Sequence, residues 1–182
     1  MAADLEKIRQ SLDTLLAKTD NSNVTEEGVK SELPDGYYLC EVTKAELTES
    51  KQGNPMVAIE YKTTEDGKMS VIDEDGMAKM ETAPKTQDKK IFVNYVLSSE
   101  QNVNYFVADM LKFEDPETGD SIFDKKSDFD STDAIINVCD ILSEGAMVYI
   151  MASTTESTNE PGKMVKKYKP ISWKRAERLE LI

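Results

Sequence analysis

Residues 33–62 read LPDGYYLCEVTKAELTESKQGNPMVAIEYK, and this stretch predicts two long β-strands joined by a polar turn. Pro34-Asp35-Gly36 favours an entry turn, because Pro fixes φ and Gly tolerates a tight bend. Apolar and polar residues then alternate with the period of a strand. Residues 51–55 interrupt the pattern, and β-branched and aromatic residues resume it. We therefore expect a long hairpin that begins a β-rich domain.

The chain has 182 residues, enough for one domain with a hydrophobic core, and it contains no histidine. Histidine is the commonest general base and a usual zinc ligand, so any enzyme hypothesis narrows to carboxylate and lysine chemistry. The sequence also lacks a glycine-rich phosphate loop, a nucleophile elbow and a C-x-x-C pair. We expect a binding protein that is not an enzyme and that uses no metal or other cofactor.

The two cysteines, Cys40 and Cys139, lie far apart among apolar neighbours, which predicts buried free thiols rather than a disulfide. No apolar run approaches the roughly 20 residues that span a bilayer, and the N-terminus lacks the apolar core of a secretion signal. These features predict a cytoplasmic protein with no membrane partner.

Residues 3–18 predict an amphipathic helix, because apolar residues recur at helical spacing among charged ones. Its apolar positions are Leu5, Ile8, Leu12, Leu15 and Leu16. We divide the chain into this helix with a polar linker (1–32), a main domain (33–174) and a charged tail (175–182). The leucine stripe either packs against the domain or contacts a partner, and a homo-oligomer is one interpretation.

The main domain contains three more strands, two helices and two acidic insertions. The insertion at about 63–90 predicts a small hairpin around Asp73-Glu74-Asp75-Gly76. A capping box from Ser98 to Gln101 begins one helix, and Gly145 ends the other. The expected strands are 89–97, 146–154 and 164–173, the second helix starts near 131–132, and the second insertion covers about 114–130.

These elements predict an α+β fold that is mainly β, with a five-stranded OB-like barrel. A helical insertion between the third and fourth of five strands is the order of the OB-fold, and the extra helix precedes it.

Two motifs also resemble phage-encoded proteins of the single-stranded-DNA-binding type. Residues 33–38 are similar to that family's P-x-G-x-Y entry, and residues 48–55 to its T-x-S/T-K-x-G-N/T corner. The closing strand at 166–171 looks similar too, but the acidic C-terminal tail of better-known members is missing. The resemblance covers about 33–173 and implies an OB-like barrel that binds single-stranded DNA in a bacterial host cell.

Binding a single strand requires cations along the phosphates and exposed aromatic rings on which bases stack. The OB-fold supplies them from its second and third strands and the flanking loops. The candidates near those strands are Lys51, Lys62, Lys89, Lys90 and Phe92. The last hairpin, the most basic part of the chain, adds Lys163, Lys166, Lys167, Tyr168, Lys169 and Trp173. We expect the last hairpin to be the better site.

Structural roles compete with these assignments. Strand alternation places Tyr95 in phase with Ile91 toward the core, and Phe92 on the opposite face. Trp173 closes a strand, and lysines on an edge strand keep it soluble. Pro34-Asp35 with Glu60-Tyr61-Lys62 matches the PD…ExK pattern of Mg²⁺-dependent nucleases, but the Pro-Asp-Gly turn explains Asp35 without catalysis.

The net charge of -13 supports an alternative function. The acidic loops are able to mimic nucleic acid and occupy the basic channel of a host defence nuclease, in the manner of anti-CRISPR proteins. The partner would then be a CRISPR effector nuclease, contacted through the acidic loops or the N-terminal helix. The sequence leaves both functions open.

Overall fold

The computed structural model describes residues 5–19, 24–25, 28–29 and 33–182. These belong to two compact units, Met1–Glu32 and Leu33–Ile182. The first unit contains helix α1 (Leu5–Lys18) and two short paired strands, β1 (Val24–Thr25) and β2 (Gly28–Val29). The predicted N-terminal helix is confirmed, and its five large apolar side chains are 49–72% exposed.

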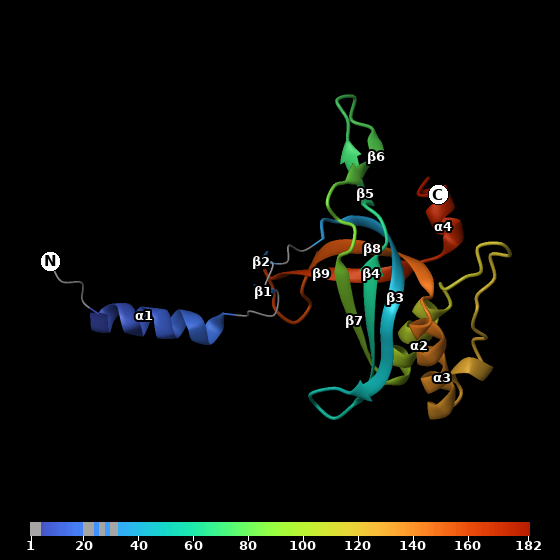
Figure 1. Cartoon of the computed structure of the whole chain (residues 1–182), viewed down its shortest axis with the longest axis horizontal. Coiled ribbons are helices and arrows are strands. Elements are labelled where there is room, and N and C mark those ends of the chain that lie inside the picture. Colours follow the sequence, from blue (N-terminus) through green and yellow to red (C-terminus); the bar gives the residue numbers. More distant parts are fainter. Residues whose placement is uncertain (1–4, 20–23, 26–27, 30–32) are drawn as a thin grey trace. The chain divides into compact units, whose positions relative to one another are not determined.

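The second unit contains one antiparallel sheet of seven strands (Figure 1). Its strands are β3 (Gly36–Glu49), β4 (Pro55–Thr63), β5 (Gly67–Ile72), β6 (Ala78–Ala83), β7 (Lys90–Val96), β8 (Met147–Glu156) and β9 (Met164–Ile171). Their order is β6-β5-β3-β4-β7, with β8 joining β3 and β9 joining β8. A mainly β fold with helices is confirmed, as is the hairpin predicted in the first acidic insertion, now β5–β6.

The sequence predicts a five-stranded OB-like barrel, whereas the structure has an open sheet of seven strands. The hairpin β5–β6 joins the same sheet through one register pair, Tyr37 with Lys68, and raises the count to seven. Within residues 33–182, β7 pairs only with β4 and β9 only with β8, so the sheet stays open between them. The hairpin extends away from the rest of this unit (Figure 1).

Strand β3 is long enough to belong to both halves of the sheet. Residues 36–41 pair with β8, and residues 40–49 pair with β4. The register of β3 against β4 shifts between Val42 and Lys44, an irregularity of the kind that bends a strand. Glycine is required where β5 crosses β3, because a Cβ at Gly67 would overlap the ring of Tyr38.

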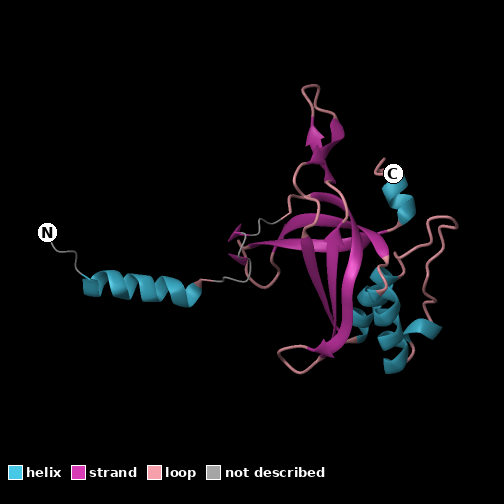
Figure 2. Ribbon diagram, viewed as in Figure 1, coloured by secondary structure: helices cyan, strands magenta, loops and turns pink. Residues whose placement is uncertain are grey.

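The main core lies between the inner face of the sheet and helices α2 (Glu100–Met110) and α3 (Thr132–Ser143), which stand together beside the sheet in Figure 2. A 3₁₀ turn, η1 (Ser127–Phe129), precedes α3. Ser131 caps α3, and Gly145 follows it with φ +99°, as predicted. The cap of α2 is Ser99 rather than Ser98, because the Ser99 side chain accepts from Asn102 N–H.

The last residues of the chain, 173–182, pack on the sheet and include a short helix. Helix α4 (Trp173–Arg178) buries Ala176 against Tyr149 and Ile171 on the outward side of β8 and β9. Leu181 is buried in the same cluster. A short apolar stripe thus anchors the terminus through a second, smaller core.

Cys40 and Cys139 are both buried and free, as predicted. Burial raises the pKa of the Cys139 thiol to about 11. Among the described residues, no helix is long and apolar enough to cross a membrane.

Candidate nucleic-acid interface

The strands β3, β4 and β7 present one side to solvent and the other to the core. In β4 the buried and half-buried residues alternate strictly from Met56 to Thr63. We call the outward side of these three strands the Phe92 face. It consists of Glu41, Thr43, Lys44 and Glu46 of β3, Ala58, Glu60 and Lys62 of β4, and Lys90, Phe92 and Asn94 of β7.

Phe92 is the large aromatic residue of this face and is 58% exposed, as its phase in the strand predicts. It lies directly opposite Glu60 in the register of β4 and β7. Tyr95 points the other way, as expected, and its ring meets Phe106 edge to face at 5.3 Å. An exposed phenyl ring held on a paired strand offers a flat apolar surface at low entropic cost.

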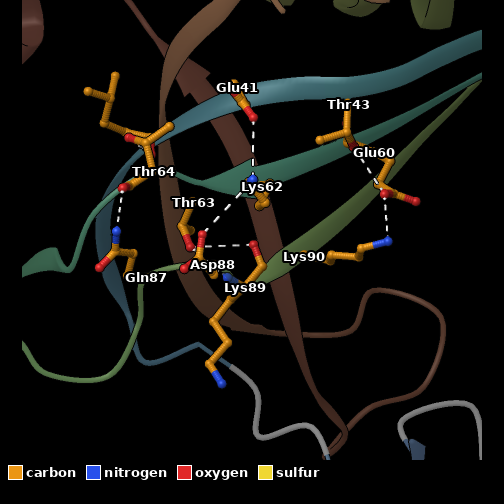
Figure 3. Close-up of polar contacts among 11 residues, drawn as sticks. Glu41, Thr43, Glu60, Lys62, Thr63, Thr64, Gln87, Asp88, Lys89 and Lys90 are labelled. Carbon is orange, nitrogen blue, oxygen red and sulfur yellow. Dashed lines mark hydrogen bonds and ion pairs between the residues drawn. The ribbon is translucent and has the colours of Figure 1, made fainter.

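Two predicted cations, Lys62 and Lys90, share this face with Phe92. Both contact carboxylates (Figure 3). Lys90 Nζ lies 2.9 Å from Glu60 Oε1, and Lys62 Nζ lies 3.5 Å from Glu41 Oε1 and 4.0 Å from Asp88 Oδ1. Exposed pairs of this kind contribute only about 0–1 kcal/mol each. Because these ion pairs are weak, an anionic group of a ligand is able to compete with the carboxylates for both lysines.

The loop at residues 84–89 lies at one end of the Phe92 face and is held by hydrogen bonds. Thr63 Oγ1 donates to Thr86 O at 2.6 Å, and Asp66 Oδ1 accepts from the backbone N–H groups of Thr86 and Gln87. These backbone hydrogen bonds hold the pKa of Asp66 below its usual value. Two non-glycine residues of the loop, Lys85 and Asp88, have φ near +60°. The loop is held in this conformation by its hydrogen bonds.

Two further candidates lie off the Phe92 face. The side chain of Lys89 points away from Lys62 and Lys90 (Figure 3). Its backbone N–H donates to Thr63 Oγ1 at 2.8 Å, so Lys89 helps to hold the loop against β4. Lys51 is exposed in the turn between β3 and β4, at the opposite end of the hairpin from Lys62.

The last hairpin does not form the single basic site that we expected. In the β8–β9 register Lys166, Tyr168 and Pro170 share one side of β9, and Lys167 and Lys169 share the other. Lys166 Nζ lies 2.5 Å from Asp35 Oδ1, and its side chain is only 13% exposed.

The aromatic residues expected there are also engaged. Tyr168 is half-buried against the main core. Trp173 packs on Tyr149 with ring centroids 5.5 Å apart, and its backbone N–H donates to Glu114 Oε2. Lys163 contacts Glu160 at 3.1 Å. Lys167 and Lys169 stay exposed, so alternation splits the run of lysines between two sides of the strand.

The nuclease pattern is not assembled. Asp35 Oδ1 accepts from Lys166 and Thr154 of the last hairpin, whereas Glu60 contacts Lys90 on β7. The two carboxylates thus belong to different parts of the sheet. Among the described residues, no group of three metal-ligating side chains is found.

Three residues of the candidate site were not predicted from the sequence: Thr43, Glu60 and Asn94. Thr43 Oγ1 donates to Glu60 Oε1 at 3.0 Å, and Asn94 is exposed one step along β7 from Phe92. Their phase in the strands was readable from the sequence. The pairing of β4 with β7 across the inserted hairpin was not.

A protein-family model matches residues 17–177, with the description "Protein of unknown function (DUF669)". The chain belongs to the DUF669 family. A search of the curated proteins finds no match. The DUF669 match covers β3 to β9 whole, so the Phe92 face lies within the region that defines the family.

Proposed function

We propose that this DUF669 protein binds single-stranded nucleic acid on the Phe92 face, without chemistry, as phage single-stranded-DNA-binding proteins do. The observation that carries the proposal is the 58% exposed ring of Phe92, set between Lys90 and Asn94 on a regular strand. Base stacking on an exposed aromatic ring contributes about 1–3 kcal/mol per base. Lys62 on β4 and Lys90 on β7 supply contacts to the phosphates.

The strand pairing supports an OB-like reading of the sheet. Strands β3, β4, β7, β8 and β9 follow the order of the five barrel strands, with β5–β6 as an insertion and α2 and α3 between the third and fourth. The first of them pairs with both the second and the fourth. In this correspondence β4 and β7 are the second and third strands, the OB surface that binds oligonucleotides.

The carboxylates on the face predict weak, salt-sensitive binding. A phosphate must displace Glu60 from Lys90 and Glu41 from Lys62, so each phosphate contact is offset by a broken ion pair. The same acidic groups repel the two phosphate strands of a duplex more strongly than they repel one. We therefore propose selectivity for single strands from stacking, with charge as a smaller contribution.

Oligonucleotide titration at two salt concentrations tests this function. The affinity for a labelled 20-mer should fall with salt, and Lys62→Ser with Lys90→Ser should weaken binding and flatten the salt dependence. The matched control is Lys163→Ser with Lys169→Ser, two exposed lysines off the face. Equal losses in the two double variants would contradict the assignment of the site.

The hairpin β5–β6 favours a second candidate function, inhibition of a host nuclease. Its turn carries Asp73, Glu74 and Asp75, flanked by Ile72 and Met77 that are 69% and 67% exposed. An acidic turn with apolar flanks suits the basic, partly apolar channel of a nucleic-acid enzyme. Capture of a nuclease from host lysate, lost in Ile72→Ser with Met77→Ser and unchanged in Phe92→Ala, would favour this candidate.

A further inference from the structure

We propose that the Phe92 face prefers single strands that contain guanine, and that Glu60 is the residue that recognises this base. The inference rests on the proposed function and names the ligand class of the same site. It depends on how the Glu60 carboxylate is held beside the ring of Phe92.

Thr43 and Lys90 hold the Glu60 side chain in place. Thr43 Oγ1 lies 3.0 Å from Glu60 Oε1 and 3.2 Å from the Glu60 backbone oxygen, and Lys90 Nζ lies 2.9 Å from Oε1. The Glu60 side chain is only 22% exposed, against 47% for Lys90. The register places Glu60 directly opposite Phe92, where Cβ atoms are about 4.5–5.5 Å apart. Glu60 and its Lys90 partner therefore occupy the positions next to Phe92, one across the register and one along β7.

This arrangement complements one base better than the others. A carboxylate only accepts hydrogen bonds, at about four lone-pair sites, and an ammonium group only donates. The Watson–Crick edge of guanine carries two adjacent donors, N1–H and the N2 amino group, followed by the O6 acceptor. A guanine stacked on Phe92 is able to donate both N–H groups to Glu60 while O6 accepts from Lys90. Adenine and cytosine offer one donor position on that edge, and thymine offers one N–H between two carbonyls.

A second carboxylate of the face, Glu46, lacks this setting. Glu46 contacts Lys44 at 3.3 Å, but it lies opposite Ala58, so no aromatic ring stands next to it on β4. The side chains of Glu46 and Lys44 are 50% and 63% exposed. Glu46 is thus a matched control: it has the same charge, the same face and a lysine partner, without the ring.

The test uses the full chain and four fluorescent 12-mers of thymidine with one central guanine, hypoxanthine, adenine or cytosine. Hypoxanthine differs from guanine only in lacking the N2 amino group. We expect guanine to bind about fivefold or more tightly than hypoxanthine, the low end for a bidentate contact. Glu60→Gln should abolish the difference, because an amide presents an N–H toward N1–H. Glu46→Gln should preserve the preference for guanine over hypoxanthine. Thr43→Val should reduce this preference, because it releases the Glu60 carboxylate from its hydrogen bond with Thr43.

The outcomes separate this inference from the function on which it rests. Equal binding of all four oligonucleotides, or a guanine preference that survives Glu60→Gln, overturns the role of Glu60. If Phe92→Ala weakens all four equally in that case, the proposed function stands alone. If none of the four binds at low salt, the proposed function fails and the inference fails with it.

Discussion

The ammonium group of Lys166 lies 2.5 Å from Asp35 Oδ1, joining the last strand of the sheet to the turn that opens the first. Asp35 also accepts from Thr154, through the backbone N–H at 3.1 Å and the hydroxyl at 2.7 Å. The most basic strand of the chain thus uses one of its lysines to close the fold. A basic run on a strand is evidence for a ligand site only after its phase and its internal partners are known.

Asp35→Asn should destabilise the fold at neutral pH and have no effect in acid. The hydrogen bonds from Lys166 and Thr154 hold the pKa of Asp35 below its usual value of 3.8. The stabilisation that these Asp35 contacts give the fold is therefore complete above about pH 4. It is lost as the pH falls through the folded-state pKa of Asp35. We expect a loss of about 0.2–1 kcal/mol at pH 7, because the Asp35 side chain is 54% exposed and solvent screens the pair.

Urea unfolding of the wild type and Asp35→Asn at pH 7 and pH 2.5 measures this contribution. Urea is uncharged and leaves ion pairs unscreened. Asp88→Asn, at the longer 4.0 Å contact with Lys62, is a control from which we expect a smaller loss. A difference between Asp35→Asn and wild type that persists unchanged at pH 2.5 would refute the assignment.

Gly67→Ala should destabilise the protein strongly through the crossing of β5 over β3. An added Cβ would overlap the Tyr38 ring and the backbone oxygen of Tyr37, and Tyr38 is fully buried. Overpacking of this kind costs about 1–3 kcal/mol. Gly76→Ala is the control for the backbone alone: a Cβ at Gly76 meets nothing within 4 Å, and its cost comes from φ +79°. The midpoint temperature of thermal unfolding should be lower for Gly67→Ala than for Gly76→Ala and for the wild type.

Asp109→Asn should stabilise the protein at pH 7. Burial raises the pKa of Asp109, against the opposing effect of the Tyr95 hydroxyl that donates to Oδ2 at 3.0 Å. A raised carboxyl pKa means that stability falls as the pH rises from the unfolded-state value through the folded-state value. Asparagine keeps an acceptor for Tyr95 and carries no charge to desolvate.

Unfolding by urea at several pH values checks the Asp109 prediction. The free energy of unfolding of Asp109→Asn should exceed that of the wild type by an amount that grows between about pH 4 and neutrality. This difference should be smallest in acid. A variant that is less stable than wild type at pH 7 would show that the buried charge is stabilising, opposite to the sign derived from its burial.

The elements of the fold are predictable from the sequence to a greater extent than their assembly. Alternation in residues 36–62 and 89–97 predicted the three strands of the Phe92 face and the exposure of Phe92, because phase within a strand is a local property. The hairpin β5–β6 was also local, since its acidic turn marks it. Its addition to the sheet depends on Gly67 lying against Tyr38, a contact with no sequence signal of its own.

The candidate site was recovered in part for the same reason. Lys62 and Lys90 were found because their strands were found, but their contacts with Glu41 and Glu60 follow from the register of three strands. The preference for the last hairpin rested on its positive charge, whereas strand phase divides its lysines between two sides of β9. Asp35 is 131 positions from Lys166, and their pairing reflects the path of β3 beside β8.

The most direct test of the account compares two exposed aromatic residues. Phe92 on the Phe92 face and Tyr105 on α2 are 58% and 59% exposed, so their truncation removes similar surface. Binding of a fluorescent, thymidine-rich 20-mer at low salt should weaken in Phe92→Ala by about fivefold or more, the cost of losing one stacked base. Tyr105→Ala should bind as the wild type does. Equal affinities for wild type and both variants, or no binding by the wild type at low salt, would contradict the central claim.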